Sequence, residues 1–123
     1  MVVPDAIRAE LRAHAEEEAP NECCGVIVFR DGVAERYVRG VNTLKSPYRY
    51  ELYLDPVLWS ELGDEQAIFH SHPETEAKPS RTDREHIGEW AGQPYLIYSV
   101  RRDELRAWRV TRDGADEIAV RRM

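Results

Sequence analysis

The stretch HSHPETEAKPSRTD, residues 70–83, brings two histidines, a serine and an aspartate close together in the chain. On a β-strand, side chains at positions i and i+2 point to the same face, so His70 and His72 can direct their imidazole nitrogens at one point. A borderline cation such as Zn²⁺ accepts imidazole and carboxylate ligands. A catalytic zinc site uses three protein ligands and leaves one position to water. His70, His72 and Asp83 supply that number of ligands.

The elements expected around this stretch support a shared site. Residues 66–72 form an apolar run that ends in the two histidines, which predicts a central strand covered on both faces. Ser80 can cap a helix that runs to about Ala91. Asp83 falls on the apolar stripe of that helix and is therefore expected to face inward. The other residues of the stripe are Ile87, Trp90 and Ala91.

The rest of the chain alternates between expected helices and strands. Residues 5–18 carry apolar side chains at helical spacing, which predicts an amphipathic helix. Residues 24–29 and 33–38 flank a turn and predict a β-hairpin. The remaining expected elements are a loop at 42–50, strands around 48–54, 95–100, 105–111 and 117–121, and a short helix from Asp55-Pro56 through Leu62. The sequence therefore predicts one α/β domain over residues 1–123, with a mixed sheet packed by helices.

Composition limits the classes of function. The chain has 123 residues, 42% hydrophobic and 33% charged, which is typical of a globular protein. We expect a cytoplasmic protein, because no apolar run approaches the roughly 20 residues of a membrane-spanning helix and the first residues lack a signal-peptide pattern. A formal net charge of −6 disfavours non-specific nucleic-acid binding. Neither nucleic acid nor membrane is an expected partner. The adjacent Cys23 and Cys24 are expected to be buried free thiols.

Each part of the 70–83 stretch also has a purely structural interpretation. Ser80 and Asp83 match a capping box, in which both side chains satisfy backbone N–H groups and bind no metal. A His-x-His pair also occurs on strands by chance. We favour metal binding because an inward acid, placed at the start of the helix after such a strand, completes a three-ligand site. The other histidines and nearby acids are interpreted as packing or surface groups: His14, Glu74, Glu76 and His86.

A hydrolytic zinc site also needs a general base. Zinc lowers the pKa of a bound water to about 7, and a nearby carboxylate takes the proton and later delivers it to the leaving amine. Glu22, just before the expected strand at 24–29, is the candidate. By spacing alone it is no better than several other acids of the chain.

Two segments resemble the JAMM (MPN+) metalloprotease family. The order His70-Ser71-His72-Pro73, followed by Ser80 and Asp83, resembles the family's motif, and PNECCGVI, residues 20–27, is similar to the segment that bears its catalytic glutamate. The resemblance implies a cytidine-deaminase-like α/β fold over the whole chain. It implies further that the two histidines and Asp83 bind zinc, that Glu22 deprotonates a water, and that Ser80 donates a hydrogen bond to the oxyanion.

Within the family, the loop at 75–83 looks most like bacterial peptidases of the CysO-cysteine type, which act on ubiquitin-like sulfur-carrier proteins. This implies hydrolysis of the amide after the carrier's diglycine C-terminus, with release of cysteine for cysteine biosynthesis. The alternatives are a general isopeptidase or tail-trimming protease for ubiquitin-like proteins, and a non-catalytic MPN scaffold. The oligomeric state stays open.

The carrier's tail is expected to lie as an added strand along residues 46–50 and the strand that follows. Arg81 is expected to meet a carboxylate on the released residue. An ordinary solvated loop and a surface arginine are the alternatives.

Overall fold

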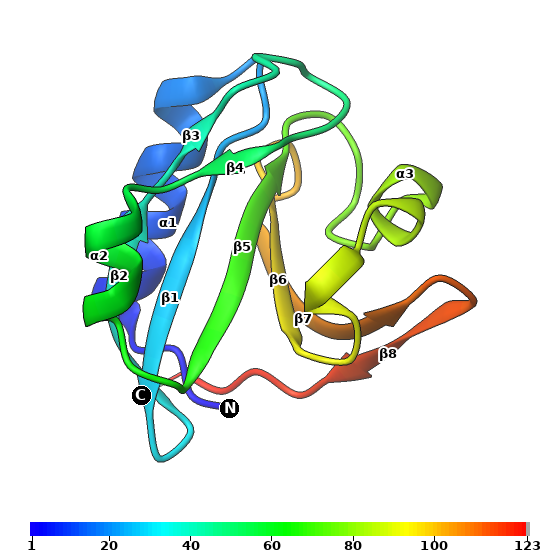
Figure 1. Ribbon diagram of the computed structural model, residues 1–123. Helices are drawn as coiled ribbons and strands as arrows, with labels where there is room; N and C mark the ends of the chain where they lie inside the picture. Colours follow the sequence, from blue (N-terminus) through cyan, green and yellow to red (C-terminus); the bar gives the residue numbers. More distant parts are fainter. Residues whose placement is uncertain (123) are drawn as a thin grey trace.

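A mixed β-sheet forms the centre of the molecule, whose computed structural model describes residues 1–122 (Figure 1). Within these residues the sheet has six strands in the order β2-β1-β5-β6-β7-β8. Strands β5 and β6 run parallel, and all other neighbouring strands run antiparallel. The strands are β1 (Cys24–Arg30), β2 (Val33–Arg39), β5 (Gln66–His72), β6 (Pro94–Ser99), β7 (Glu104–Thr111) and β8 (Gly114–Ile118).

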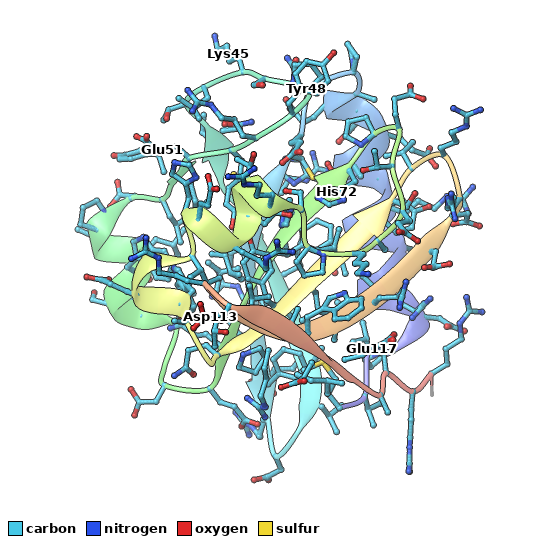
Figure 2. The ribbon with its side chains drawn as sticks, turned by 90° about the vertical axis from the view of Figure 1, so that its right-hand side faces the viewer. Lys45, Tyr48, Glu51, His72, Asp113 and Glu117 are labelled. Carbon is cyan, nitrogen blue, oxygen red and sulfur yellow. The ribbon has the colours of Figure 1, made fainter. Side chains whose placement is uncertain are left out.

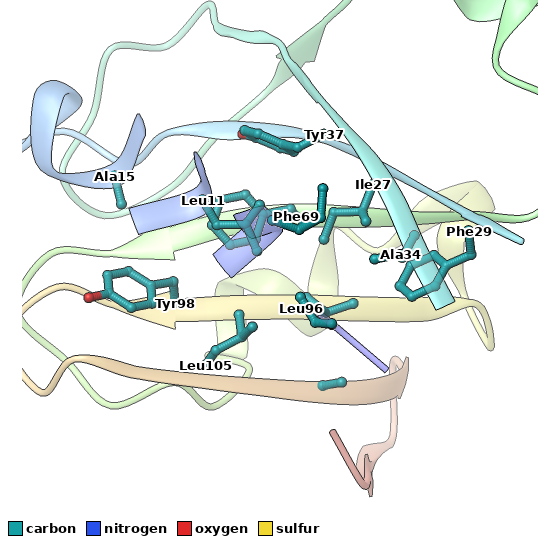
Figure 3. Close-up of a cluster of buried hydrophobic side chains, with 14 of the residues drawn as sticks. Leu11, Ala15, Ile27, Phe29, Ala34, Tyr37, Phe69, Leu96, Tyr98 and Leu105 are labelled. Carbon is teal, nitrogen blue, oxygen red and sulfur yellow. The ribbon is translucent and has the colours of Figure 1, made fainter. Parts of the chain in front are cut away.

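Helix α1 (Asp5–Glu18) covers one face of this sheet. Its buried side chains recur at the spacing of one helical turn, and Leu11 and Ala15 pack with Ile27 and Phe69 of the sheet (Figure 3). The amphipathic helix expected at residues 5–18 is therefore confirmed. The structure's helices, in the part that is described, are too short or too polar to cross a membrane.

The opposite face of the sheet is covered by short elements. A second apolar cluster joins Ile68 and Ile97 of the sheet to Leu54, Leu62 and Ile87. The elements on this side are β3 (Val41–Asn42), β4 (Leu52–Tyr53), α2 (Pro56–Glu61), α3 (Arg81–Glu85) and the 3₁₀-helix η1 (Gly88–Trp90). The segment 43–51, which joins β3 to β4, lies at the end of the sheet where β5 terminates (Figure 2).

Strand β5 has the central place that its apolar run predicted. It pairs with β1 on one side and with β6 on the other, and Ala67, Ile68 and Phe69 are buried. Its last residue is His72. His70 and His72 share the face of Ile68, so both histidines lie on the side that carries α3 rather than α1.

The helix after Ser80 is shorter than the expected one. Helix α3 ends at Glu85, and the chain continues as η1 instead of running to Ala91 as one helix. Gly88 has a φ angle of +54°, a left-handed conformation that interrupts a right-handed helix. Asp83 and Ile87 are buried and Trp90 packs partly buried against the second cluster, whereas Ala91 is exposed, so the predicted stripe is correct up to Trp90.

Two strands differ from their expected ranges. Of the strand expected around 48–54, only β4 is formed. Its partner β3 ends at Asn42, where the sequence predicted the start of a loop. The last strand is β8 and not residues 117–121, because the tight turn after β7 pairs Thr111 directly with Gly114. Strand β8 therefore begins immediately at Gly114. The hairpin β1–β2, strand β5 and the α2 cap at Asp55 are confirmed.

Candidate metal centre

Three side chains converge at the end of β5. His70 Nε2 lies 3.1 Å from His72 Nε2 and 3.2 Å from Asp83 Oδ2, and His72 Nε2 lies 3.1 Å from the same oxygen. The three atoms thus form a nearly equilateral triangle, and all three residues are buried. For zinc–nitrogen bonds of about 2.0–2.1 Å, neighbouring ligands of a regular tetrahedron are about 3.3 Å apart. The triangle has the size of one face of such a tetrahedron.

The first turn of α3 fixes the position of Asp83. Ser80 Oγ accepts a hydrogen bond from the Asp83 N–H at 3.0 Å, and the Ser80 N–H donates to Asp83 Oδ2 at 2.9 Å. These two bonds are the capping box that the sequence offered as an alternative to metal binding. Because Oδ2 also faces both histidines, the cap and the ligand set use the same carboxylate. The two interpretations are compatible.

The protonation states around the triangle suit a cation. His72 Nδ1 lies 2.8 Å from the carbonyl oxygen of Glu76, which only accepts, so Nδ1 carries a proton. Although burial by itself lowers the pKa of His72, the adjacent Asp83 carboxylate outweighs burial and raises it. In its neutral form His72 therefore presents its lone pair on Nε2. Burial lowers the pKa of His70 and favours its neutral imidazole. Burial by itself raises the pKa of Asp83, but His70 and His72 outweigh burial and hold it well below its usual range. Neutral imidazoles and an ionised carboxylate are the forms that bind a divalent metal.

Glu22 lies beside the triangle. Its side chain is 3% exposed, and its Oε1 is 4.0 Å from His70 Nε2. Within the described residues, Oε1 has no hydrogen-bond partner, and burial raises the pKa of Glu22 to about 8. Its backbone is fixed, because its N–H donates to the Ser46 carbonyl at 2.8 Å and its carbonyl accepts from Asn42 at 3.0 Å. A buried carboxyl group without a partner is costly unless a ligand or ion compensates it.

The residues interpreted as packing or surface groups lie apart from the triangle. His14 is buried in α1, on the other face of the sheet, and its Nδ1 is 2.6 Å from the Tyr37 hydroxyl. His86 is exposed, and its Nδ1 lies 3.0 Å from the Thr82 carbonyl oxygen. Glu74 and Glu76 are exposed and face surface arginines.

Two further expectations concern Arg81 and the cysteines. Arg81 does not point into the site: its side chain is 85% exposed and pairs with Glu85 at 2.8 Å. Cys23 and Cys24 are free and buried, as expected. Burial raises the pKa of Cys23 to about 12, so the thiol stays protonated.

The sequence placed Tyr50 in the segment 46–50 expected to bind the carrier's tail, but it did not reveal that Tyr50 and Tyr95 contact His70. The Tyr50 ring stacks on the His70 ring with centroids 4.5 Å apart, and Tyr95 meets His70 edge-on at 5.1 Å. The signal was weak, because Tyr50 lies in a segment of irregular pattern twenty residues before His70. Tyr50 also borders a groove of about 420 Å³ that runs from Asp83 between the segment 44–52 and α3.

The sequence and the fold are similar to those of known proteins. The model of the family described as prokaryotic homologs of the JAB domain matches residues 4–111. The CysO-cysteine peptidase of Mycobacterium tuberculosis is 38% identical over 124 residues, which cover 89% of this chain and 84% of that protein. The desampylase of Haloferax volcanii is 33% identical over 104 residues, covering 77% and 74%. A JAB1/MPN domain protein from Archaeoglobus fulgidus has a TM-score of 0.68 at 16% identity, covering 100% of this chain and 99% of that one.

Proposed function

This chain belongs to the family of prokaryotic JAB-domain homologs, and we propose that it is a zinc-dependent peptidase. Its substrate would be a ubiquitin-like sulfur-carrier protein, cleaved at the amide after the diglycine C-terminus with release of cysteine. The main support for the proposal is the buried triangle of His70, His72 and Asp83 with Glu22 beside it. Glu22 Oε1 lies 4.0 Å from His70 Nε2 and has no hydrogen-bond partner within residues 1–122. The CysO-cysteine peptidase relative supports the choice of substrate.

Each residue of the site has a role in this proposal. His70, His72 and Asp83 would hold the zinc, which when bound supplies a Lewis acid that lowers the pKa of water. Glu22 accepts the proton of the attacking water and delivers it to the leaving amine. The Ser80 hydroxyl, whose oxygen accepts the Asp83 N–H, keeps its own proton free to donate to the oxyanion that develops on the attacked carbonyl.

The groove beside Asp83 would hold the carrier's tail. Glu51 and Leu52 line one wall and Thr82 and Ile87 line the other. A diglycine segment has no side chains to grip, so it would bind through backbone hydrogen bonds as an added strand beside β4. Replacing the penultimate glycine of the carrier with alanine is expected to slow cleavage sharply, whereas an equally fast reaction would exclude a glycine-selective path.

A carrier–cysteine adduct tests the proposed reaction. Wild-type protein with stoichiometric zinc should release the free carrier and cysteine, as measured by mass spectrometry. His72→Ala should lose most of the metal and the activity, because removing one of three ligands leaves an incomplete site. His14→Gln, on the α1 side of the sheet and away from the groove, is the control and should retain both. Full zinc occupancy and turnover in His72→Ala would refute the site.

General isopeptidase activity is the second candidate, and the desampylase relative supports it. The same assay distinguishes the two when it also contains a carrier joined to a lysine side chain. Preference for the cysteine adduct supports the primary proposal, and equal or faster cleavage of the lysine conjugate supports the isopeptidase. A protein without stoichiometric zinc that cleaves neither would be a scaffold.

We place the activity in the cytoplasm, a proposal supported by the free thiols of Cys23 and Cys24.

A further inference from the structure

The two histidines of the triangle are supported differently. Metal-ligating histidines usually donate their second ring N–H to a carboxylate or a carbonyl, which fixes the orientation of the ring. His72 follows this pattern, because its Nδ1 lies 2.8 Å from the Glu76 carbonyl oxygen. His70 does not, since its Nδ1 has no hydrogen-bond partner within residues 1–122 although the residue is fully buried. Another interaction must orient the His70 ring.

Two tyrosines enclose the His70 ring. Tyr50 stacks on it with an interplanar angle of 24°, and Tyr95 meets it at 83°. The two phenol oxygens are 2.5 Å apart and hydrogen-bonded to each other. Tyr95 is buried in β6, where it is the register partner of Ile68, so it is a rigid support. Tyr50 comes from the segment between β3 and β4 and is half-buried. The hydrogen bond therefore ties this segment to the sheet directly over His70.

We propose that Tyr50, held by Tyr95, is a positioning residue that keeps His70 oriented for zinc. This inference rests on the zinc site of the proposed function. A dication withdraws electron density from a coordinated imidazole, so the ring gains positive character. The electron-rich face of a phenol attracts such a ring, as it attracts other cations. Stacking by Tyr50 therefore stabilises the loaded site more than the metal-free one.

The position of Tyr50 also connects the metal site to the groove. Tyr50 lines the groove beside Asp83 while its ring covers His70. A displacement of the segment 43–51 would consequently change the packing on a ligand as well as the groove wall. The segment that would bind the carrier's tail thus also supports the metal.

Zinc affinity tests this role without requiring any peptidase substrate. The dissociation constant is measured by competition with a chromophoric chelator for wild type, Tyr50→Phe and Tyr50→Leu. Tyr50→Leu is expected to bind zinc about 10–100-fold more weakly, the usual effect of losing a support behind a ligand. Tyr50→Phe keeps the stacked ring and should recover most of the affinity. Tyr48→Leu is the matched control, because Tyr48 lies in the same segment with 81% exposure and should leave zinc binding unchanged.

The outcomes separate this inference from the proposed function. Wild-type affinity in Tyr50→Leu, or equal losses in Tyr50→Leu and Tyr50→Phe, would overturn the positioning role of the ring. A wild-type protein that binds no zinc would overturn the metal site itself. A protein that binds zinc but cleaves no carrier adduct would refute the proposed function and leave the role of Tyr50 intact. Thermal melting of the metal-free variants checks their folding, and Tyr50→Met replaces Tyr50→Leu if the latter does not fold.

Discussion

Asp83 shows how much one carboxylate does in this site. Its Oδ2 accepts the Ser80 N–H at 2.9 Å and lies 3.1 Å from His72 Nε2 and 3.2 Å from His70 Nε2. The same oxygen therefore takes part in the capping box at the start of α3 and completes the proposed ligand set. Replacing Asp83 would remove a helix cap together with a ligand. His72 is the cleaner position at which to test metal binding, because within residues 1–122 the only other polar contact of its side chain is with the Glu76 carbonyl oxygen.

Glu22→Gln is expected to separate the general base from the ligands. The amide keeps the size of the side chain but cannot accept the proton, so turnover should fall by at least ~10²-fold while zinc content is retained. The kinetics of carrier–cysteine cleavage and metal analysis measure the two effects. The control is Glu76→Gln, which replaces an exposed acid in the loop after β5 and should cleave at the wild-type rate. Wild-type turnover in Glu22→Gln would exclude Glu22 as the general base.

For individual residues, the sequence predicted the three members of the triangle but not the tyrosine that stacks on one of them. His70, His72 and Asp83 were identifiable because strand periodicity and a helix start bring nearby residues together. Glu22 could be found only through the resemblance, since β1 meets β5 by long-range pairing. The stacking of Tyr50 on His70 could not be predicted, because it depends on the path of an irregular segment. Contacts of this kind leave no periodic pattern in a sequence.

Ser80 caps the start of α3, and in the proposed function its hydroxyl would also donate to the oxyanion; substitutions can separate these two roles. Ser80→Ala loses the cap, which should destabilise the protein by about 1 kcal/mol, whereas glycine at a cap position costs only a few tenths. Both variants lose the hydroxyl proton and should lose about 10²-fold or more in turnover. Thermal melting combined with kinetics tells the effects apart. A Ser80→Gly variant with wild-type turnover would exclude Ser80 as the oxyanion donor.

Among the elements, those whose apolar pattern is continuous were predicted best. Strands β1 and β5 match their expected ranges to within one residue, because the sheet buries every residue of their apolar runs. The helix after Ser80 was predicted too long, because apolar residues continue at helical spacing through Trp90 while Gly88 adopts a left-handed conformation. The strands β3 and β4 were poorly predicted, since two-residue strands carry too few positions for an alternating pattern.

Close packing between β1 and β2 makes Gly25 sensitive to substitution. A Cβ atom at Gly25 would lie 2.5 Å from the Tyr37 hydroxyl and 2.5 Å from the Val38 carbonyl oxygen. Gly25→Ala is therefore expected to lower the free energy of unfolding by about 1–3 kcal/mol, as overpacking does. Urea denaturation measures this change. Gly114→Ala is the control, since nothing lies within 4 Å of the added atom. Equal stability of both variants would contradict the close contact.

The molecule as a whole has two differently built sides. The α1 side is an apolar core in which Leu11, Ile27 and Phe69 pack together. The other side carries the triangle, the groove and the short elements around them. His14 is the histidine of the α1 side, and it joins α1 to the sheet through the Tyr37 hydroxyl. Stability can therefore be tested on one side without touching the ligands on the other.

The burial of His14 between α1 and the sheet is expected to make the free energy of unfolding depend on pH. Burial, assisted by Arg39, lowers the pKa of His14 to about 4, from an ordinary value near 6.5. Between these values the unfolded chain binds the proton and the folded protein does not, so the free energy of unfolding falls as the pH falls. The shift of His14 alone contributes a loss of about 2 kcal/mol between pH 7 and pH 5. Glu22, whose pKa burial raises to about 8, contributes in the opposite direction over this interval, so the contribution of His14 is measured as the difference between wild type and the variant. His14→Gln can still accept the Tyr37 hydroxyl but cannot titrate, so urea denaturation of this variant should show a smaller loss over the same interval. The same loss in both proteins would show that acidic groups, and not His14, set the pH dependence.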